Sequence, residues 1–98
     1  MESPLHDFFD TLQGQPERLG YAVRFCYGGD SALALRELNW AFADGYVQFF
    51  RINKEVEENL EAFEIGDLLR HSAVLPLSNE ILDAVFIRLT DKGLKRME

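Results

Sequence analysis

The chain of 98 residues lacks several features that define common protein classes. It has one cysteine, Cys26, so neither an internal disulfide nor a cysteine zinc cluster can form within it. No apolar run approaches the ~20 residues that are needed to span a bilayer. The first four residues, Met-Glu-Ser-Pro, include an acid and show no apolar core of a secretory signal. We therefore expect a cytoplasmic protein without a membrane segment.

Positive charge is also scarce. The chain has 10 basic against 17 acidic residues, a net charge of -7 and a pI near 4.7. The acids are concentrated, because residues 53–83 alone hold eight of them and only two bases. A negative field repels phosphate, so the charge disfavours DNA binding and binding to anionic membranes.

Apolar residues are abundant enough for a core. Hydrophobic residues make up 47% of the chain and aromatic residues 12%, and no repeat or low-complexity stretch interrupts them. A chain of this length fits one domain. We therefore expect residues 1–98 to form a single domain.

Three amphipathic segments predict helices in the first half of the chain. Apolar residues recur at helical spacing over residues 4–12, where Ser3 is a suitable cap, and again over 19–26. Residues 32–44 form the third segment, which Gly45 is expected to end. The third segment has two apolar surfaces, because Leu33 and Trp40 lie opposite its main apolar face.

Two apolar segments predict strands. Residues 46–52 and 84–89 are rich in aromatic and β-branched residues. Thr90 then caps a short C-terminal helix. This order of elements indicates an α+β fold.

Residues 53–84 have no single period. Val56, Leu60 and Phe63 fit a helical stripe that Gly66 interrupts. Residues 73–77 are expected to be extended, because Pro76 disfavours helical backbone at Leu75. Ser78 then caps a short helix that ends near residue 83.

Two strings resemble winged helix-turn-helix proteins. Residues 38–47, LNWAFADGYV, are similar to the segment in which the recognition helix of that family ends and the wing begins. Residues 86–97, FIRLTDKGLKRM, resemble the returning wing strand and the following helix of MarR- and PadR-type regulators. The resemblance implies a small winged-helix-like domain of three helices, a two-stranded wing and a C-terminal helix. Residues 53–84 would then be an acidic insertion within the wing.

The resemblance also implies a function. A winged-helix-like protein of this size would have a non-enzymatic regulatory role, exerted through DNA or through a DNA-bound partner. Arginine pairs with guanine and asparagine with adenine, and cations bind phosphates. The candidate nucleic-acid-binding residues are Arg36, Asn39, Lys54, Lys92, Lys95 and Arg96. Alternatively, these residues belong to a solvent-exposed helix face or interact favourably with a helix dipole.

A second hypothesis is an acidic protein-interaction module of the same fold, such as an assembly subunit, an inhibitor or an immunity-type protein. Tryptophan is enriched where interfaces concentrate their binding energy. A protein partner or a second copy of the chain would bind residues 53–84 and the Trp40 face. The candidate partner-binding residues are Leu33, Trp40, Glu57, Glu58 and Glu61. The alternative is that residues 53–84 pack over Leu33 and Trp40 as part of the core.

Catalytic and cofactor motifs are not evident in the sequence. Gly28-Gly29-Asp30-Ser31 precedes a predicted helix but lacks the lysine and hydroxyl residues of a phosphate loop. His6 and His71 are the only histidines, and neither lies in a metal-binding motif. We therefore expect no enzyme activity, no cofactor, no metal and no small-molecule substrate.

Overall fold

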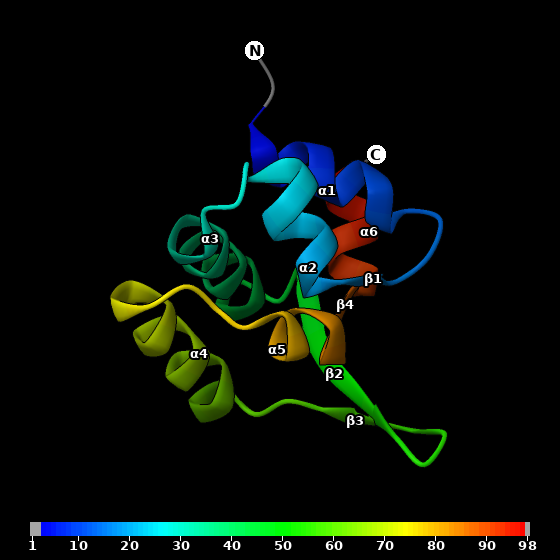
Figure 1. Cartoon of the computed structure of the whole chain (residues 1–98). Helices are drawn as coiled ribbons and strands as arrows, with labels where there is room; N and C mark the ends of the chain where they lie inside the picture. The colour runs from blue at the N-terminus through cyan, green and yellow to red at the C-terminus, as the bar shows by residue number, and fades with distance from the viewer. Residues whose placement is uncertain (1–2, 98) are drawn as a thin grey trace.

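The computed structural model describes residues 3–97, which fold as an antiparallel sheet with helices packed against it (Figure 1). The sheet has four strands in the order β1-β4-β2-β3. In chain order the elements are α1 (Pro4–Leu12), β1 (Glu17–Arg18), α2 (Leu19–Tyr21), η1 (Ala22–Cys26), α3 (Ser31–Ala43), β2 (Val47–Asn53), β3 (Val56–Asn59), α4 (Ala62–Val74), α5 (Asn79–Ala84), β4 (Val85–Leu89) and α6 (Asp91–Met97). The predicted α+β class is therefore confirmed.

Helices α1 and α3 form where the sequence predicted them. The Ser3 hydroxyl accepts from the His6 amide at 3.2 Å, and the Asp30 carboxylate accepts from the Leu33 amide at 3.0 Å. Each cap satisfies an amide that the first turn leaves without a partner. Gly45 follows α3 with a φ of 82°, a conformation that glycine adopts without a steric penalty.

The predicted helix over residues 19–26 has a different form. The short helix α2 continues as the π-helical segment η1, and both lie against other helices. The two-residue strand β1 precedes them and pairs with β4, so that Glu17 lies opposite Ile87 and Arg18 opposite Phe86. The sequence did not predict β1, because two residues are too few to show an alternating pattern.

Strands β2 and β4 pair directly and divide their side chains between two faces. Val47, Phe49 and Ile87 lie on the face that packs against the helices. Phe50 lies on the other face, where the Phe86 ring stacks on it at 5.5 Å and the Arg88 guanidinium covers it at 4.8 Å. Phe50 is therefore buried without belonging to the helix-packed core.

The helical stripe predicted for Val56, Leu60 and Phe63 is wrong. Residues Val56–Asn59 form β3, which pairs with β2 through a tight turn at Lys54 and Glu55. Both turn residues have positive φ, 51° and 69°, the geometry that matches the twist of a hairpin. The usual Asn-Gly signal for this turn is absent, so the hairpin was not predicted. The sheet consequently has four strands where the wing was expected to have two.

Helix α4 is continuous through Gly66, where the sequence predicted an interruption. A reciprocal capping box between Glu61 and Glu64 begins the helix, and the helix ends before the extended Leu75. The Ser78 cap of α5 is confirmed, because its hydroxyl accepts from the Ile81 amide at 3.3 Å.

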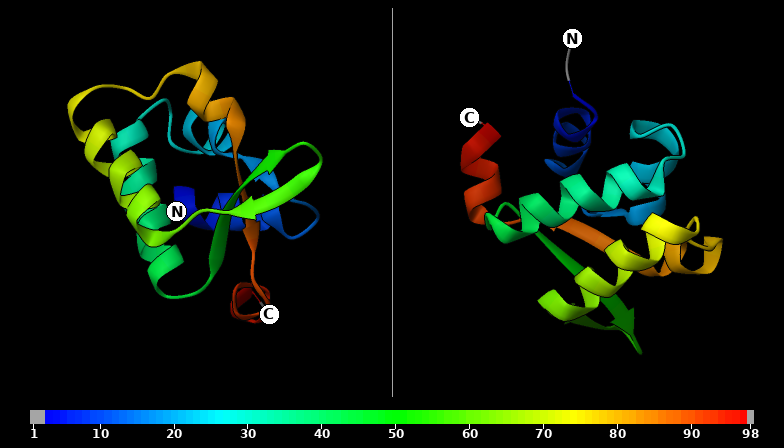
Figure 2. Two further views of the ribbon diagram at one scale, coloured as in Figure 1. Left: turned by 90° about the horizontal axis from the view of Figure 1, so that it is seen from below. Right: turned by 90° about the vertical axis from the view of Figure 1, so that its left-hand side faces the viewer.

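Residues 53–84 form β3, α4 and α5, and some of their side chains belong to the core. Helix α4 lies alongside α3 (Figure 2), and Ile65 of α4 is fully buried. Leu60, Leu77 and Leu82 belong to the same cluster of buried residues. These elements do not decide whether the fold is of the winged-helix type, which stays a prediction.

Thr90 connects the end of β4 to the end of α3. Its hydroxyl donates to the Gly45 carbonyl and accepts from the Gly93 amide at 3.1 Å, which confirms the predicted cap of the last helix. Its own amide donates to the Tyr46 carbonyl at 3.0 Å. The two strings that carry the family resemblance therefore contact each other through Thr90, and we call this set of contacts the Thr90 junction.

Gly93→Ala is expected to destabilise the protein by about 2 kcal/mol, because a side chain there forces the Thr90 junction apart. A Cβ at this buried position would collide with the Tyr46 carbonyl oxygen. Urea unfolding followed by circular dichroism measures the loss. Gly14→Ala is the matched control, since a Cβ at Gly14 meets nothing within 4 Å. Equal stability of the two variants would contradict this account of the junction.

Candidate functional site at the exposed face of α3

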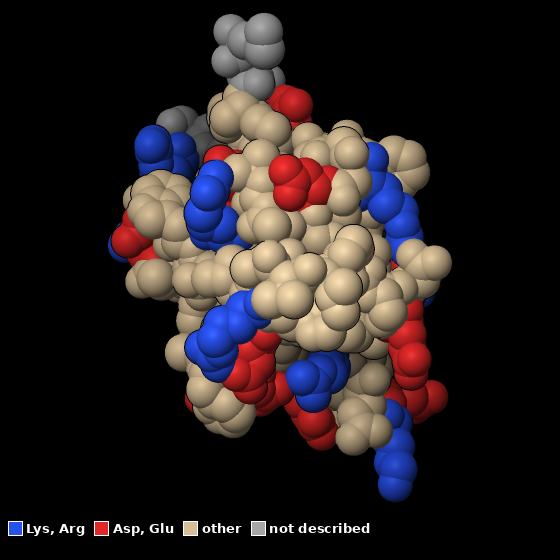
Figure 3. Space-filling view, turned by 60° about the vertical axis from the view of Figure 1, so that its left-hand side comes forward, with Lys and Arg blue, Asp and Glu red and all other residues tan. Residues whose placement is uncertain are grey.

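Helix α3 buries one side and exposes the other. Ala34, Leu35 and Leu38 are fully buried in the core. On the opposite side, Leu33 is half-buried, Arg36 is exposed, and Trp40 has 55% of its surface exposed. Figure 3 shows this side of the molecule, with uncharged residues across its middle and charged residues above and below. The two apolar surfaces predicted for this helix are therefore present.

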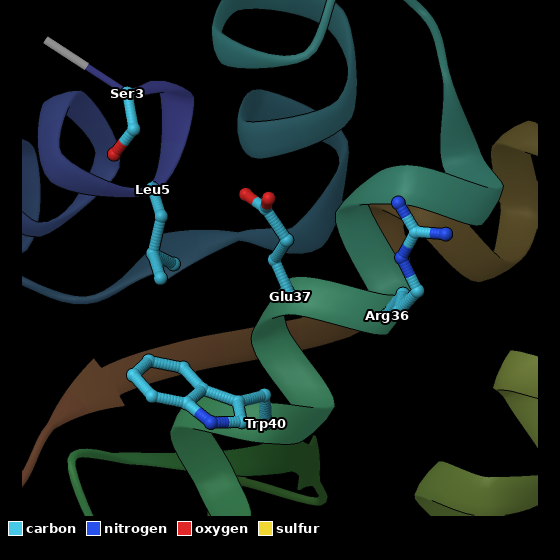
Figure 4. A pocket seen from close by; sticks show the side chains of 5 residues that line it. All are labelled: Ser3, Leu5, Arg36, Glu37 and Trp40. Atoms are coloured by element: carbon cyan, nitrogen blue, oxygen red, sulfur yellow. The ribbon is translucent and has the colours of Figure 1, made fainter.

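A hollow of about 370 Å³ lies between the start of α1 and α3. In Figure 4, Leu5 of α1 points toward the Trp40 indole, and Glu37 projects from α3 between Leu5 and Arg36, whose guanidinium points away from the indole. The Trp40 ring also lies against Tyr46, with 6.2 Å between ring centroids. Trp40 thus packs against Tyr46 on one side and is exposed to solvent on the other.

A second hollow of about 570 Å³ lies between α3 and α4. Leu33 and Ala32 of α3 line one wall, and Leu69 and Ala73 of α4 line the other. Arg36 lines this hollow and the first one. We call the two hollows together, from Leu5 and Trp40 to Leu33 and Leu69, the α3 groove.

The acidic residues that border the α3 groove are engaged in structural hydrogen bonds. The Glu37 carboxylate accepts from the buried Tyr27 hydroxyl at 2.8 Å, and the Asp30 carboxylate caps α3. Burial raises the pKa of Tyr27, and the hydrogen bond and charge of Glu37 raise it further. Both carboxylates therefore have hydrogen-bond partners within the fold.

The predicted nucleic-acid-binding residues do not come together. Arg36 is exposed in the α3 groove and Asn39 is half-buried on the same helix. Lys54 is at the tip of the β2–β3 hairpin, whereas the exposed Lys95 and Arg96 are in α6. Figure 1 shows the hairpin tip and α6 at opposite ends of the molecule.

Lys92 contacts the end of α3. Its ammonium donates to the Asp44 carbonyl at 2.6 Å and lies 5.0 Å from the centre of the Tyr46 ring. It therefore complements the C-terminal end of α3, whereas Lys95 and Arg96 are in the last turn of their own helix.

The predicted partner-binding residues have separate environments. Leu33 faces the hollow that α4 borders, while Trp40 stays open, so residues 53–84 cover this face only in part. Glu57 pairs with Arg88 at 2.5 Å, Glu61 caps α4, and Glu58 is exposed. The acidic segment is also tied to the rest of the chain by Arg51–Glu64 at 2.7 Å and Arg24–Asp83 at 3.1 Å.

Chemistry-bearing side chains do not cluster elsewhere in the described part of the chain. Within residues 3–97, no three His, Cys, Asp or Glu side chains are placed to hold a metal ion. Cys26 is half-buried, and burial and the charge of Asp7 raise the pKa of its thiol. None of the helices in this range is long and apolar enough to cross a membrane.

Sequence reasoning missed the walls of the α3 groove. Leu5 was assigned only to the apolar stripe of α1, and Leu69 and Ala73 fall in the segment without a clear period. Only the second apolar surface of α3, at Leu33 and Trp40, signalled the site. Comparisons with protein-family models, curated proteins and solved structures found no match.

The Tyr27–Glu37 contact predicts a loss of stability at high pH. Because the pKa of Tyr27 is raised in the folded state, the folded chain retains this proton at pH values where the unfolded chain loses it. Stability should therefore fall as the pH rises above about 10, by up to about 1.4 kcal/mol per pH unit from this group. Urea unfolding of the wild type and of Tyr27→Phe from pH 8 to 11 measures the effect. Equal slopes for the two proteins would show that Tyr27 has no part in it.

Proposed function

We propose that this chain is a non-enzymatic protein-interaction module that binds a partner in the α3 groove. The observation that carries the proposal is the exposed Trp40, which lies beside an apolar hollow on the outer side of α3. Exposed, partly supported tryptophans are the residues on which interfaces most depend. A regulatory role, if the chain has one, is then exerted through a protein, such as a DNA-bound regulator.

Direct DNA reading by α3 has less support. A recognition helix enters the major groove of DNA, so the space around it must be open. Here α4 lies along one flank of α3, and α1 borders the other. The net charge of -7 opposes phosphate binding as well.

A winged-helix-like scaffold remains our proposal for the fold type. It is supported by the Thr90 junction, which joins the two family-like strings, and by the direct pairing of β2 with β4, the two strands assigned to the wing. In this proposal β3 extends the wing at one edge, and α4 occupies the side on which DNA would approach α3.

Trp40→Ala is expected to weaken partner binding by at least tenfold, because truncating a central tryptophan removes about 2 kcal/mol or more of binding energy. The readout is affinity capture from the native cell extract, quantified by mass spectrometry. Phe25→Ala is the matched control, since Phe25 is 74% exposed but lies in η1, outside the α3 groove. Circular dichroism verifies that both variants fold. If every captured protein responds equally to both variants, the groove is not the docking surface.

The chain is expected not to bind mixed-sequence duplex DNA at micromolar concentrations in 50 mM salt, where nonspecific binding is strongest. Fluorescence anisotropy of a labelled duplex measures this. Salt-sensitive binding that Arg36→Ala and Lys54→Ala both weaken would favour the direct DNA-binding hypothesis instead.

A further inference from the structure

Arg36 differs from the other arginines between positions 18 and 88. The four at 24, 51, 70 and 88 each pair with a carboxylate, and the Arg18 guanidinium lies 5.4 Å from the centre of the Phe86 ring. Arg36 has no ion pair, hydrogen bond or aromatic partner among residues 3–97, although the chain carries an excess of acid. The α3 groove therefore contains a guanidinium whose hydrogen-bond donors have no protein partner within residues 3–97.

The position of Arg36 makes this charge available to a ligand. It lines both hollows, so apolar surface from Leu5 and Trp40 lies on one side and from Leu33 and Leu69 on the other. Neighbouring carboxylates do not pair with it: Glu37 accepts from Tyr27 and Asp30 caps α3, and both keep their negative charge. A carboxylate placed here gains a charge-assisted, two-pronged hydrogen bond, and the apolar walls limit its screening by water.

The spacing of the apolar positions suggests the form of the ligand. Leu33 and Trp40 are seven residues apart on α3, which is two helical turns or about 10.5 Å. A helix lying along the groove repeats its own side chains at that spacing, with the residue four positions after the first anchor between them. That middle residue would face Arg36.

On the basis of the function proposed above, we infer that the α3 groove binds an amphipathic helix of a partner protein. The helix presents two apolar side chains seven residues apart and a glutamate or aspartate between them. The apolar side chains fill the two hollows, and the carboxylate pairs with Arg36. The specificity of the site thus comes from one cation within an otherwise acidic protein.

This inference opposes what the overall charge predicts. A net charge of -7 attracts a basic peptide more strongly than an acidic one. If only long-range electrostatics act, a lysine at the middle position improves binding. If Arg36 acts as inferred, a glutamate improves it.

Three matched alanine-based helical peptides of 15 residues test the inference. Each has leucine at its fourth and eleventh positions, and the eighth position is glutamate, glutamine or lysine. Trp40 is the only tryptophan, so its indole N–H signal in a ¹⁵N-labelled full chain reports on the groove directly. We expect the glutamate peptide to shift this signal with a dissociation constant at least fivefold lower than that of the lysine peptide.

Arg36→Glu should reverse the order of the two charged peptides. Lys54→Glu is the matched control, because it changes the net charge by the same amount at the hairpin tip and should keep the wild-type order. Circular dichroism verifies the fold of each variant.

The possible failures are distinguishable. Equal or inverted preference in the wild type overturns the role of Arg36 but leaves the groove as a docking surface. A Trp40 signal that none of the peptides shifts at 2 mM overturns the proposed docking function as well. A shift that depends on protein concentration without peptide identifies a second copy of the chain as the occupant, which overturns the inference of a foreign helix.

Discussion

The packing of α4 against α3 is the interaction on which the character of this surface depends. Ile65 anchors it, since the side chain is fully buried in the core that α3 also contributes to. This packing closes one flank of α3 and turns an open helix face into a groove with two walls. It also explains why Leu33 is half-buried while Trp40, two turns later, stays exposed. The groove is therefore a product of the segment that first appeared to be an acidic insertion.

Three acidic residues of that segment contribute to the fold. Glu57, Glu64 and Asp83 pair with arginines from outside residues 53–83. Exposed ion pairs contribute little stability each, about 0–1 kcal/mol, but they favour one placement of the segment over others. Their partners are three of the chain's few cations. Arg36 has no such partner, and it carries the only charge-based specificity that we infer for the groove.

The Thr90 junction holds the other end of α3 in place. Thr90 and Gly93 bring the start of α6 against Gly45 and Tyr46, and the Tyr46 ring in turn supports the Trp40 indole. Lys92 adds a hydrogen bond to the carbonyl of Asp44, the residue that caps the C-terminal end of α3. The junction explains why Trp40 has a defined position despite its exposure. It also gives a physical role to the two strings that resemble the family, because Gly45 and Tyr46 of one string contact Thr90 of the other.

The sequence alone determined the elements whose signals are local. The caps at Ser3, Ser78 and Thr90 and the apolar stripes of α1 and α3 each depend on residues close together in the chain, so the sequence was sufficient to predict them. It also indicated that Leu33 and Trp40 form a second surface. Tertiary structure alone decided that residues 56–59 form a strand, because an exposed strand gains its stability from pairing with β2 and not from its own pattern. It likewise decided which arginines find carboxylates 13 to 59 residues away and that Arg36 finds none, since long-range contacts leave no periodic signal in the chain.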